Sequence, residues 1–97
     1  MKDLDRIKKL PGVREAVLVE KTGIPAYGKE VVLSAMTASL WALGGYFTAR
    51  FQDELRCVEI NGSSMSIFAF PYGENVLLVV AADGKVKDEI SELVECL

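Results

Sequence analysis

The sequence predicts a single α/β domain, an α+β sandwich in which a five-stranded, mostly antiparallel sheet lies between one long helix and two terminal helices. Three observations lead to this prediction. Residues 29–51 have the apolar spacing of one long helix. Short segments rich in β-branched or aromatic residues alternate with turn residues over the rest of the chain. Residues 75–82 are almost uninterruptedly apolar, as in a central strand covered on both faces.

The elements are expected in the order helix, two strands, helix, three strands and helix, within one domain over residues 1–97. They are a helix over 3–10, strands over 13–20 and 24–28, a helix over 29–51, strands over 55–60, 64–70 and 75–82, and a helix after Asp83-Gly84. Pro11-Gly12 ends the first helix, and Pro25 places the second strand at an edge. Asn61-Gly62 is a strong signal for a tight hairpin.

The long helix carries two apolar stripes. The bulky stripe is expected to pack on the sheet and consists of Val32, Met36, Leu40, Leu43 and Phe47. The small stripe suits close approach by another helix and consists of Val31, Ala35, Ala38, Ala42, Gly45 and Ala49. Because the chain has no second long helix to fill that role, we expect a second copy of the chain to supply it.

A third side of the long helix is small and polar and includes one large aromatic residue, Trp41. Since large aromatic residues are frequent at binding hot spots, we expect Thr37, Trp41 and Thr48 to contact a partner. On this interpretation Trp41→Ala weakens partner binding and leaves the fold intact. The alternative is that Trp41 packs inside the dimer.

Composition argues against several function classes. The chain has no histidine, which removes the commonest general base and zinc ligand, and it has no glycine-rich phosphate loop. Cys57 and Cys96 form neither a disulfide framework nor a zinc spacing, so we expect both thiols to be buried and reduced. We therefore expect a protein that is not an enzyme and binds no cofactor or metal.

Charge and hydropathy bear on partners and location. The net charge of -3 is the opposite of the basic surface that nucleic acid usually meets, so no nucleic-acid partner is expected. The first residues lack the apolar core of a signal peptide. No apolar run is expected to reach the length of a membrane span, which predicts a cytoplasmic protein without direct membrane insertion.

The first part of the chain resembles the opening of the roadblock (dynein light-chain) domain, in its prokaryotic single-domain form. The resemblance lies in Leu4-x-x-Ile7-x-x-Leu10-Pro11-Gly12-Val13-x-x-Ala16-Val17-Leu18-Val19, followed by Gly23-Ile24-Pro25. The alanine-rich helix and the last three strands also follow that family's order, and the match covers the whole chain. Gly44-Gly45 is an unusual pair inside a helix and costs about 1 kcal/mol per glycine relative to alanine. It is expected to mark a kink or a very close contact with another helix.

The resemblance implies a profilin/roadblock-like fold and a homodimer or heterodimer. In such a dimer the long helices pack antiparallel and the third strands join two sheets into one. The expected interface therefore combines the small stripe with the strand residues Arg56, Cys57, Val58 and Glu59.

The function implied by the resemblance is a non-catalytic dimeric scaffold that binds and regulates a small Ras-like GTPase. One alternative is an adaptor dimer that holds a peptide or a motor-complex subunit, which predicts no detectable GTPase binding. Another is a small-molecule-sensing domain, which predicts a deep, ligand-sized cavity in the monomer.

Overall fold

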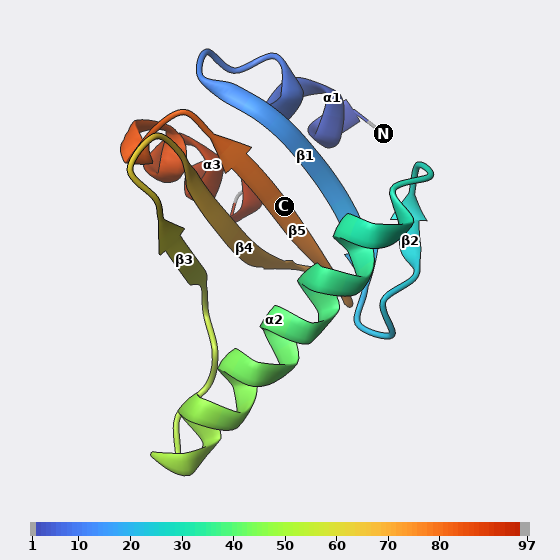
Figure 1. Cartoon of the computed structure of the whole chain (residues 1–97), viewed down its shortest axis with the longest axis vertical. Helices are drawn as coiled ribbons and strands as arrows, with labels where there is room; N and C mark the ends of the chain where they lie inside the picture. Colours follow the sequence, from blue (N-terminus) through green and yellow to red (C-terminus); the bar gives the residue numbers. More distant parts are fainter. Residues whose placement is uncertain (1, 96–97) are drawn as a thin grey trace.

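In the computed structural model, which describes residues 2–95, one antiparallel sheet lies between two helical layers (Figure 1). The elements are α1 (Lys2–Lys8), β1 (Val13–Glu20), β2 (Pro25–Tyr27), α2 (Val31–Arg50), β3 (Val58–Asn61), β4 (Ser66–Tyr72), β5 (Asn75–Ala81), a 3-10 turn η1 (Gly84–Val86) and α3 (Lys87–Glu95). The strand order is β2-β1-β5-β4-β3, and all pairs are antiparallel. The predicted fold class and element order are confirmed.

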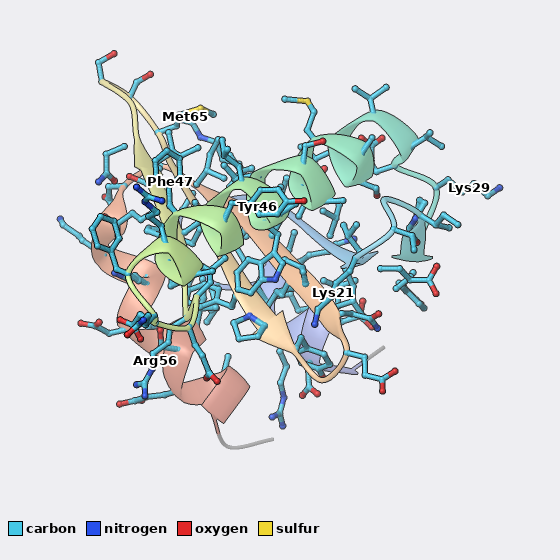
Figure 2. The ribbon with its side chains drawn as sticks, turned by 90° about the horizontal axis from the view of Figure 1, so that it is seen from below. Lys21, Lys29, Tyr46, Phe47, Arg56 and Met65 are labelled. Carbon is cyan, nitrogen blue, oxygen red and sulfur yellow. The ribbon has the colours of Figure 1, made fainter. Side chains whose placement is uncertain are left out.

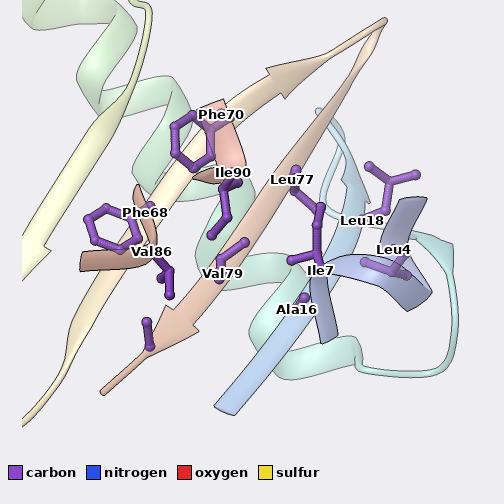
Figure 3. Packing of buried hydrophobic residues seen from close by; sticks show 11 residues of the cluster. Leu4, Ile7, Ala16, Leu18, Phe68, Phe70, Leu77, Val79, Val86 and Ile90 are labelled. Carbon is purple, nitrogen blue, oxygen red and sulfur yellow. The ribbon is translucent and has the colours of Figure 1, made fainter. Parts of the chain in front are cut away.

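The face of the sheet under α1 and α3 holds the larger hydrophobic core (Figure 3). Leu4 and Ile7 of α1 and Val86 and Ile90 from the C-terminal helical segment pack on side chains of β1, β4 and β5. These strand residues are Ala16, Leu18, Phe68, Phe70, Leu77, Val79 and Ala81. With α2 on the opposite face, β5 is covered on both sides, as its apolar sequence predicts.

The face of the sheet under α2 consists of three rows of side chains that cross the strands. The first row contains Val19 and Val76, which are buried, and Pro71, which is exposed. The second row contains Val17, Leu78 and Ala69, which are buried, and Val58, which is partly buried.

The third row, Ile60, Ile67 and Val80, crosses β3, β4 and β5 and is only partly covered. The α2 helix lies over the buried residues of the first two rows and leaves the third row partly open.

The α2 helix is rotated relative to the sequence-based expectation. Its polar side faces the sheet, where Ser34 is 0% and Thr37 is 1% exposed. Four of the five members of the bulky stripe are largely exposed instead, namely Val32, Met36, Leu43 and Phe47. The prediction that the bulky stripe packs on the sheet was wrong.

Hydrogen bonds within the helix explain this rotation. The hydroxyl of Thr37 donates to the carbonyl of Leu33 at 2.7 Å, and the hydroxyl of Ser34 donates to the carbonyl of Glu30. A hydroxyl that is satisfied by the preceding turn of its own helix presents mainly its carbon atoms to its surroundings. Both side chains are thus buried at little cost, and their small size lets the helix approach the sheet closely.

The C-terminal end of α2 closes in a Schellman motif. The N–H of Gln52 donates to the carbonyl of Ala49 at 3.0 Å, and the N–H of Asp53 donates to that of Thr48 at 3.0 Å. Gln52 has a φ of 59°, a left-handed conformation that glycine usually supplies. The chain then turns back toward the sheet and enters β3.

Gly44 and Gly45 differ in their surroundings. A Cβ atom on Gly44 would lie 3.0 Å from Leu55 Cδ2 and 3.1 Å from Val58 Cγ2, whereas one on Gly45 would meet nothing within 4 Å. Gly44 therefore marks a close contact, but with the segment entering β3 and not with another helix. It lets the segment before β3 pack directly on α2.

Several strand boundaries differ from the predictions, most of all around the β3–β4 hairpin. The third strand begins at Val58, so Arg56 and Cys57 precede it instead of lying in it. The β3–β4 hairpin has a four-residue loop, residues 62–65, closed by the N–H of Gly62 and the carbonyl of Met65 at 2.7 Å. Asn61 is held in the strand because its side chain accepts a hydrogen bond from Ser66 at 2.7 Å. The expectation of a reduced, buried Cys96 lies outside the described residues.

The expectation that no segment reaches the length of a membrane span was also wrong, because α2 is long and apolar enough for one. Over the described chain, α2 is the one helix long and apolar enough to cross a membrane, and a single such helix is weak evidence for a span. To enter a bilayer, α2 would have to leave the sheet and uncover two rows of buried side chains.

Replacing each glycine of the pair by alanine tests the close contact at Gly44. Gly45→Ala should stabilise the protein by about 0.5–1 kcal/mol, since alanine is the better helix former and space is available. Gly44→Ala should gain clearly less, because Leu55 and Val58 must move to admit the methyl group. Urea unfolding at one fixed protein concentration measures both; equal gains would contradict a tight contact.

A hydrogen bond between α1 and the β4–β5 hairpin makes the free energy of unfolding depend on pH in the alkaline range. The hydroxyl of Tyr72 donates to the carboxylate of Asp3 at 2.7 Å, and this bond raises the pKa of Tyr72 above its usual value of about 10. Because the pKa is raised in the folded state, the contribution is full below about pH 10 and is lost as the pH rises through the folded pKa. Ultraviolet titration of tyrosinate should show one late-titrating tyrosine, which Asp3→Asn shifts back toward pH 10.

Candidate functional site

The exposed side of α2 forms a large apolar surface. Three aromatic residues lie at its C-terminal end: Tyr46 and Phe47 in the helix are 75% and 65% exposed, and Phe51 directly after it is 79% exposed. Figure 2 shows Tyr46 and Phe47 on the surface of α2, clear of the sheet. The N-terminal half adds Val31, Val32 and Met36, also exposed. Contiguous apolar surfaces of this kind usually mark interaction sites.

This surface continues into a groove beside α2. The groove has a volume of about 180 Å³ and is lined by Leu33, Met36, Thr37, Leu40, Ile60, Ile67 and Leu78. One of its walls is the third row of the sheet, in which Ile60 is 44% exposed. No ionisable side chain lines it. A groove with such walls favours an apolar occupant.

The C-terminal end of α2 projects beyond the sheet (Figure 1). Gly44 lies level with Val58, the first residue of the edge strand β3. Residues 45–51 continue past that level, for about 10 Å at 1.5 Å per residue. The aromatic part of α2 is therefore the part that has no sheet of its own beneath it.

The outer edge of β3 has no neighbouring strand in the described structure. Val58 and Glu59 lie in this edge strand, and Arg56 and Cys57 lie just before it. The side chain of Glu59 is fixed by Lys87 of α3 at 2.7 Å and by the amide of Asn61 at 2.8 Å. These bonds lower the pKa of Glu59 and anchor β3 to α3, which leaves the backbone groups of its outer edge available for pairing.

Cys57 lies in a wedge between the segment before β3, the end of β4 and α3. The wedge has a volume of about 440 Å³ and is lined in part by Arg56, Phe70 and Lys87. Burial raises the pKa of the Cys57 thiol, and the positive charge of Lys87 partly opposes this increase. Cys57 is a free cysteine, and a raised pKa favours the less reactive protonated thiol at neutral pH.

The predicted small stripe does not lie on one surface. Val31, Ala35, Ala42 and Ala49 are exposed, whereas Ala38 is partly covered and lies near Gly23 of the β1–β2 turn. Gly45 has open space at its Cβ position. The assignment of this stripe to a dimer contact stays a prediction.

The predicted docking residues lie on the side of α2 that faces the sheet. Thr37 is buried, and Trp41 is partly buried against the core cluster on the α2 side of the sheet. The hydroxyl of Thr48 donates to the carbonyls of Gly44 and Gly45, both at 3.1 Å. The expectation that this side is open to a partner was wrong because internal hydrogen bonds make it compatible with an apolar sheet. The sequence analysis did not identify the exposed aromatic residues Tyr46, Phe47 and Phe51 as one candidate site. Their closeness in the sequence, directly after Gly45, was the available signal.

Comparison with known proteins identifies the fold family. The sequence pattern of the Roadblock/LC7 domain matches residues 2–82. The chain belongs to the Roadblock/LC7 domain family. No curated protein matches the chain.

Solved structures of Roadblock/LC7 domains from bacteria share the fold. A Roadblock/LC7 domain from Streptomyces avermitilis has a TM-score of 0.78 at 24% identity, covering 99% of this chain and 89% of that one. Myxococcus xanthus MglB has a TM-score of 0.80 at 22% identity, covering 97% and 80%. The gliding protein MglB of Thermus thermophilus has a TM-score of 0.74 at 20% identity, covering 96% and 83%. A further structure is described as MglB with a tetrameric arrangement.

The described part of the Roadblock/LC7 domain contains no group of three or more His, Cys, Asp or Glu side chains suited to a metal ion. Among its described side-chain nitrogen and oxygen atoms, none is buried without a hydrogen-bond partner. The exposed apolar side of α2 and the free edge of β3 are features that suit contact with another protein surface.

Stability measurements on two aromatic variants test which side of α2 is buried. Trp41→Ala should destabilise the protein by about 3 kcal/mol, because the indole packs on the sheet. Tyr46→Ala, on the exposed side, should stay within about 0.5 kcal/mol of the parent. Denaturant unfolding at a fixed protein concentration compares them; an unchanged stability for Trp41→Ala would contradict the observed rotation of α2.

Proposed function

We propose that this Roadblock/LC7 domain is a non-catalytic, cytoplasmic scaffold that forms a homodimer and binds and regulates a small Ras-like GTPase. One observation carries the proposal: the long apolar face of α2 has no covering layer within the described part of its own chain. Association would bury the large apolar side chains that a monomer exposes along this helix and at its end, namely Val32, Met36, Leu43, Phe47 and Phe51.

A dimer through α2 alone would be small. The helix is about 30 Å long, and one of its sides is already used by the sheet. Pairing of the free edges of β3 would add hydrogen bonds and apolar contact, bringing the interface toward the roughly 800 Å² per partner that stable complexes bury. It would also remove an exposed strand edge, which soluble proteins usually protect.

The GTPase is proposed to bind the surface of α2 that points away from the sheet. Tyr46 is the largest side chain there, and Ala35, Ser39 and Ala42 form a low surface next to it. Tyrosine is common at hot spots because its ring packs and its hydroxyl stays hydrogen-bonded. In this proposal Tyr46 takes the role that Trp41 was expected to have. Regulation would act through the order of the GTPase's own switch loops, since the scaffold contributes no catalytic group.

Titration with small GTPases in both nucleotide states tests the proposal. The parent protein, studied by light scattering after size separation, should be a dimer that gains the mass of one GTPase in one nucleotide state. Tyr46→Ala should weaken that binding by about tenfold or more and leave the dimer intact. Tyr27→Ala, an exposed aromatic change on β2, is the matched control and should bind like the parent.

The other outcomes are equally informative. A stable dimer that binds no GTPase would contradict the GTPase assignment and favour an adaptor that holds a peptide or another subunit. A monomer at every concentration would overturn the scaffold proposal as a whole.

A further inference from the structure

We infer that the wedge beside Cys57 is a binding site for a small monocarboxylate with an apolar body. The carboxylate is held by Arg56 and Ser91, and the apolar body lies against Phe70. Cys57 and Phe70 pack with the core under α1 and α3, so the wedge lies on the face of the sheet opposite α2. This site is therefore separate from the exposed apolar surface of α2.

The wedge exists because β3 and β4 separate from each other. The ladder between them begins at the pair Val58 and Ala69, and the chain before Val58 runs against α2 at Gly44. Within the described chain, no strand therefore lies beside the last residues of β4 on their outer side. The α3 helix covers the resulting space through Lys87 and Ser91, which are one turn apart and so lie on one side of the helix. The space of about 440 Å³ is in the range that small-molecule sites occupy.

Two hydrogen-bond donors at the wedge have no partner within the described chain. Ser91 is helical and partly covered, but its hydroxyl makes no hydrogen bond to any described residue. The hydroxyls of α2 differ, since four of them donate to carbonyls of their own helix, namely those of Ser34, Thr37, Ser39 and Thr48. Arg56 forms no ion pair with a described side chain. A guanidinium and a hydroxyl both donate, so together they suit a carboxylate.

The other charges at the wedge favour a single negative charge on the ligand. Lys87 adds a positive charge, although its Nζ atom is already 2.7 Å from Glu59. Glu54 also lines the wedge and repels a second negative charge, as on a phosphate monoester near neutral pH. The rest of the lining favours an apolar body and consists of Leu55, Cys57, Phe70 and Pro71.

Titration with phenylacetate, followed by nuclear magnetic resonance of the isotope-labelled protein, tests the site. The backbone amide signals of Cys57, Phe70 and Ser91 should move, and those of Tyr46 and Phe47 on α2 should not. Phenylacetamide has nearly the same shape without the charge and should bind about tenfold more weakly. Phenyl phosphate should also bind more weakly than phenylacetate, because its second charge meets Glu54.

Two substitutions test the residues that hold the carboxylate. Arg56→Gln should raise the dissociation constant of phenylacetate about tenfold, and the matched change Arg14→Gln on β1 should alter it less than about twofold. Both arginines are exposed, so neither change should disturb the fold. Ser91→Ala should raise the dissociation constant about threefold, and Ser39→Ala on α2 should leave it unchanged.

Several results would overturn the assignment. Amide signals that stay in place up to the solubility limit of phenylacetate, or that move on α2 instead, would exclude a ligand site in the wedge. Equal binding of phenylacetamide, tighter binding of phenyl phosphate, or unchanged binding by Arg56→Gln would contradict recognition of a monocarboxylate. Neither dimerisation nor GTPase binding is measured here, so the proposed function stands or fails separately.

Discussion

The architecture depends on the hydrogen bonds that Ser34 and Thr37 make to their own helix. Each hydroxyl is satisfied by a carbonyl one turn earlier, so the polar side of α2 packs on an apolar sheet without leaving either hydroxyl buried and unsatisfied. Once this side faces the sheet, the bulky apolar side must face outward. The exposed apolar surface of α2 is therefore a direct consequence of two short side chains.

The other elements position this surface. The close contact at Gly44 brings the segment containing Leu55 against α2, so that β3 begins where the helix leaves the sheet. The ion pair between Lys87 and Glu59 holds β3 from the opposite face. As a result, a free strand edge, an open apolar row and a projecting aromatic helix end lie together. Each would be unfavourable in an isolated monomer, and all three are compatible with one protein partner.

Much of the fold could be predicted because its signals are local. The apolar run of β5 predicts a strand covered on both faces, and the structure confirms it. Pro11-Gly12 predicts that the first helix ends at Leu10; a first helix is present, but it ends at Lys8. The start of β3 was less predictable, since Arg56 and Cys57 have strand-like neighbours and only pairing with β4 decides where the ladder begins. The loop after Asn61 was mispredicted because a side-chain hydrogen bond to Ser66 extends the strand.

The sequence by itself determined that α2 is one long helix with too much apolar surface for the rest of the chain to cover, and it determined the family to which the chain belongs. Only the tertiary structure decided which side of that helix is buried. Helical spacing places residues on sides but does not rank them, and the usual polarity ranking fails where hydroxyls are satisfied within the helix. That rotation moved the candidate interaction residues from Trp41 and Thr37 to Tyr46, Phe47 and Phe51.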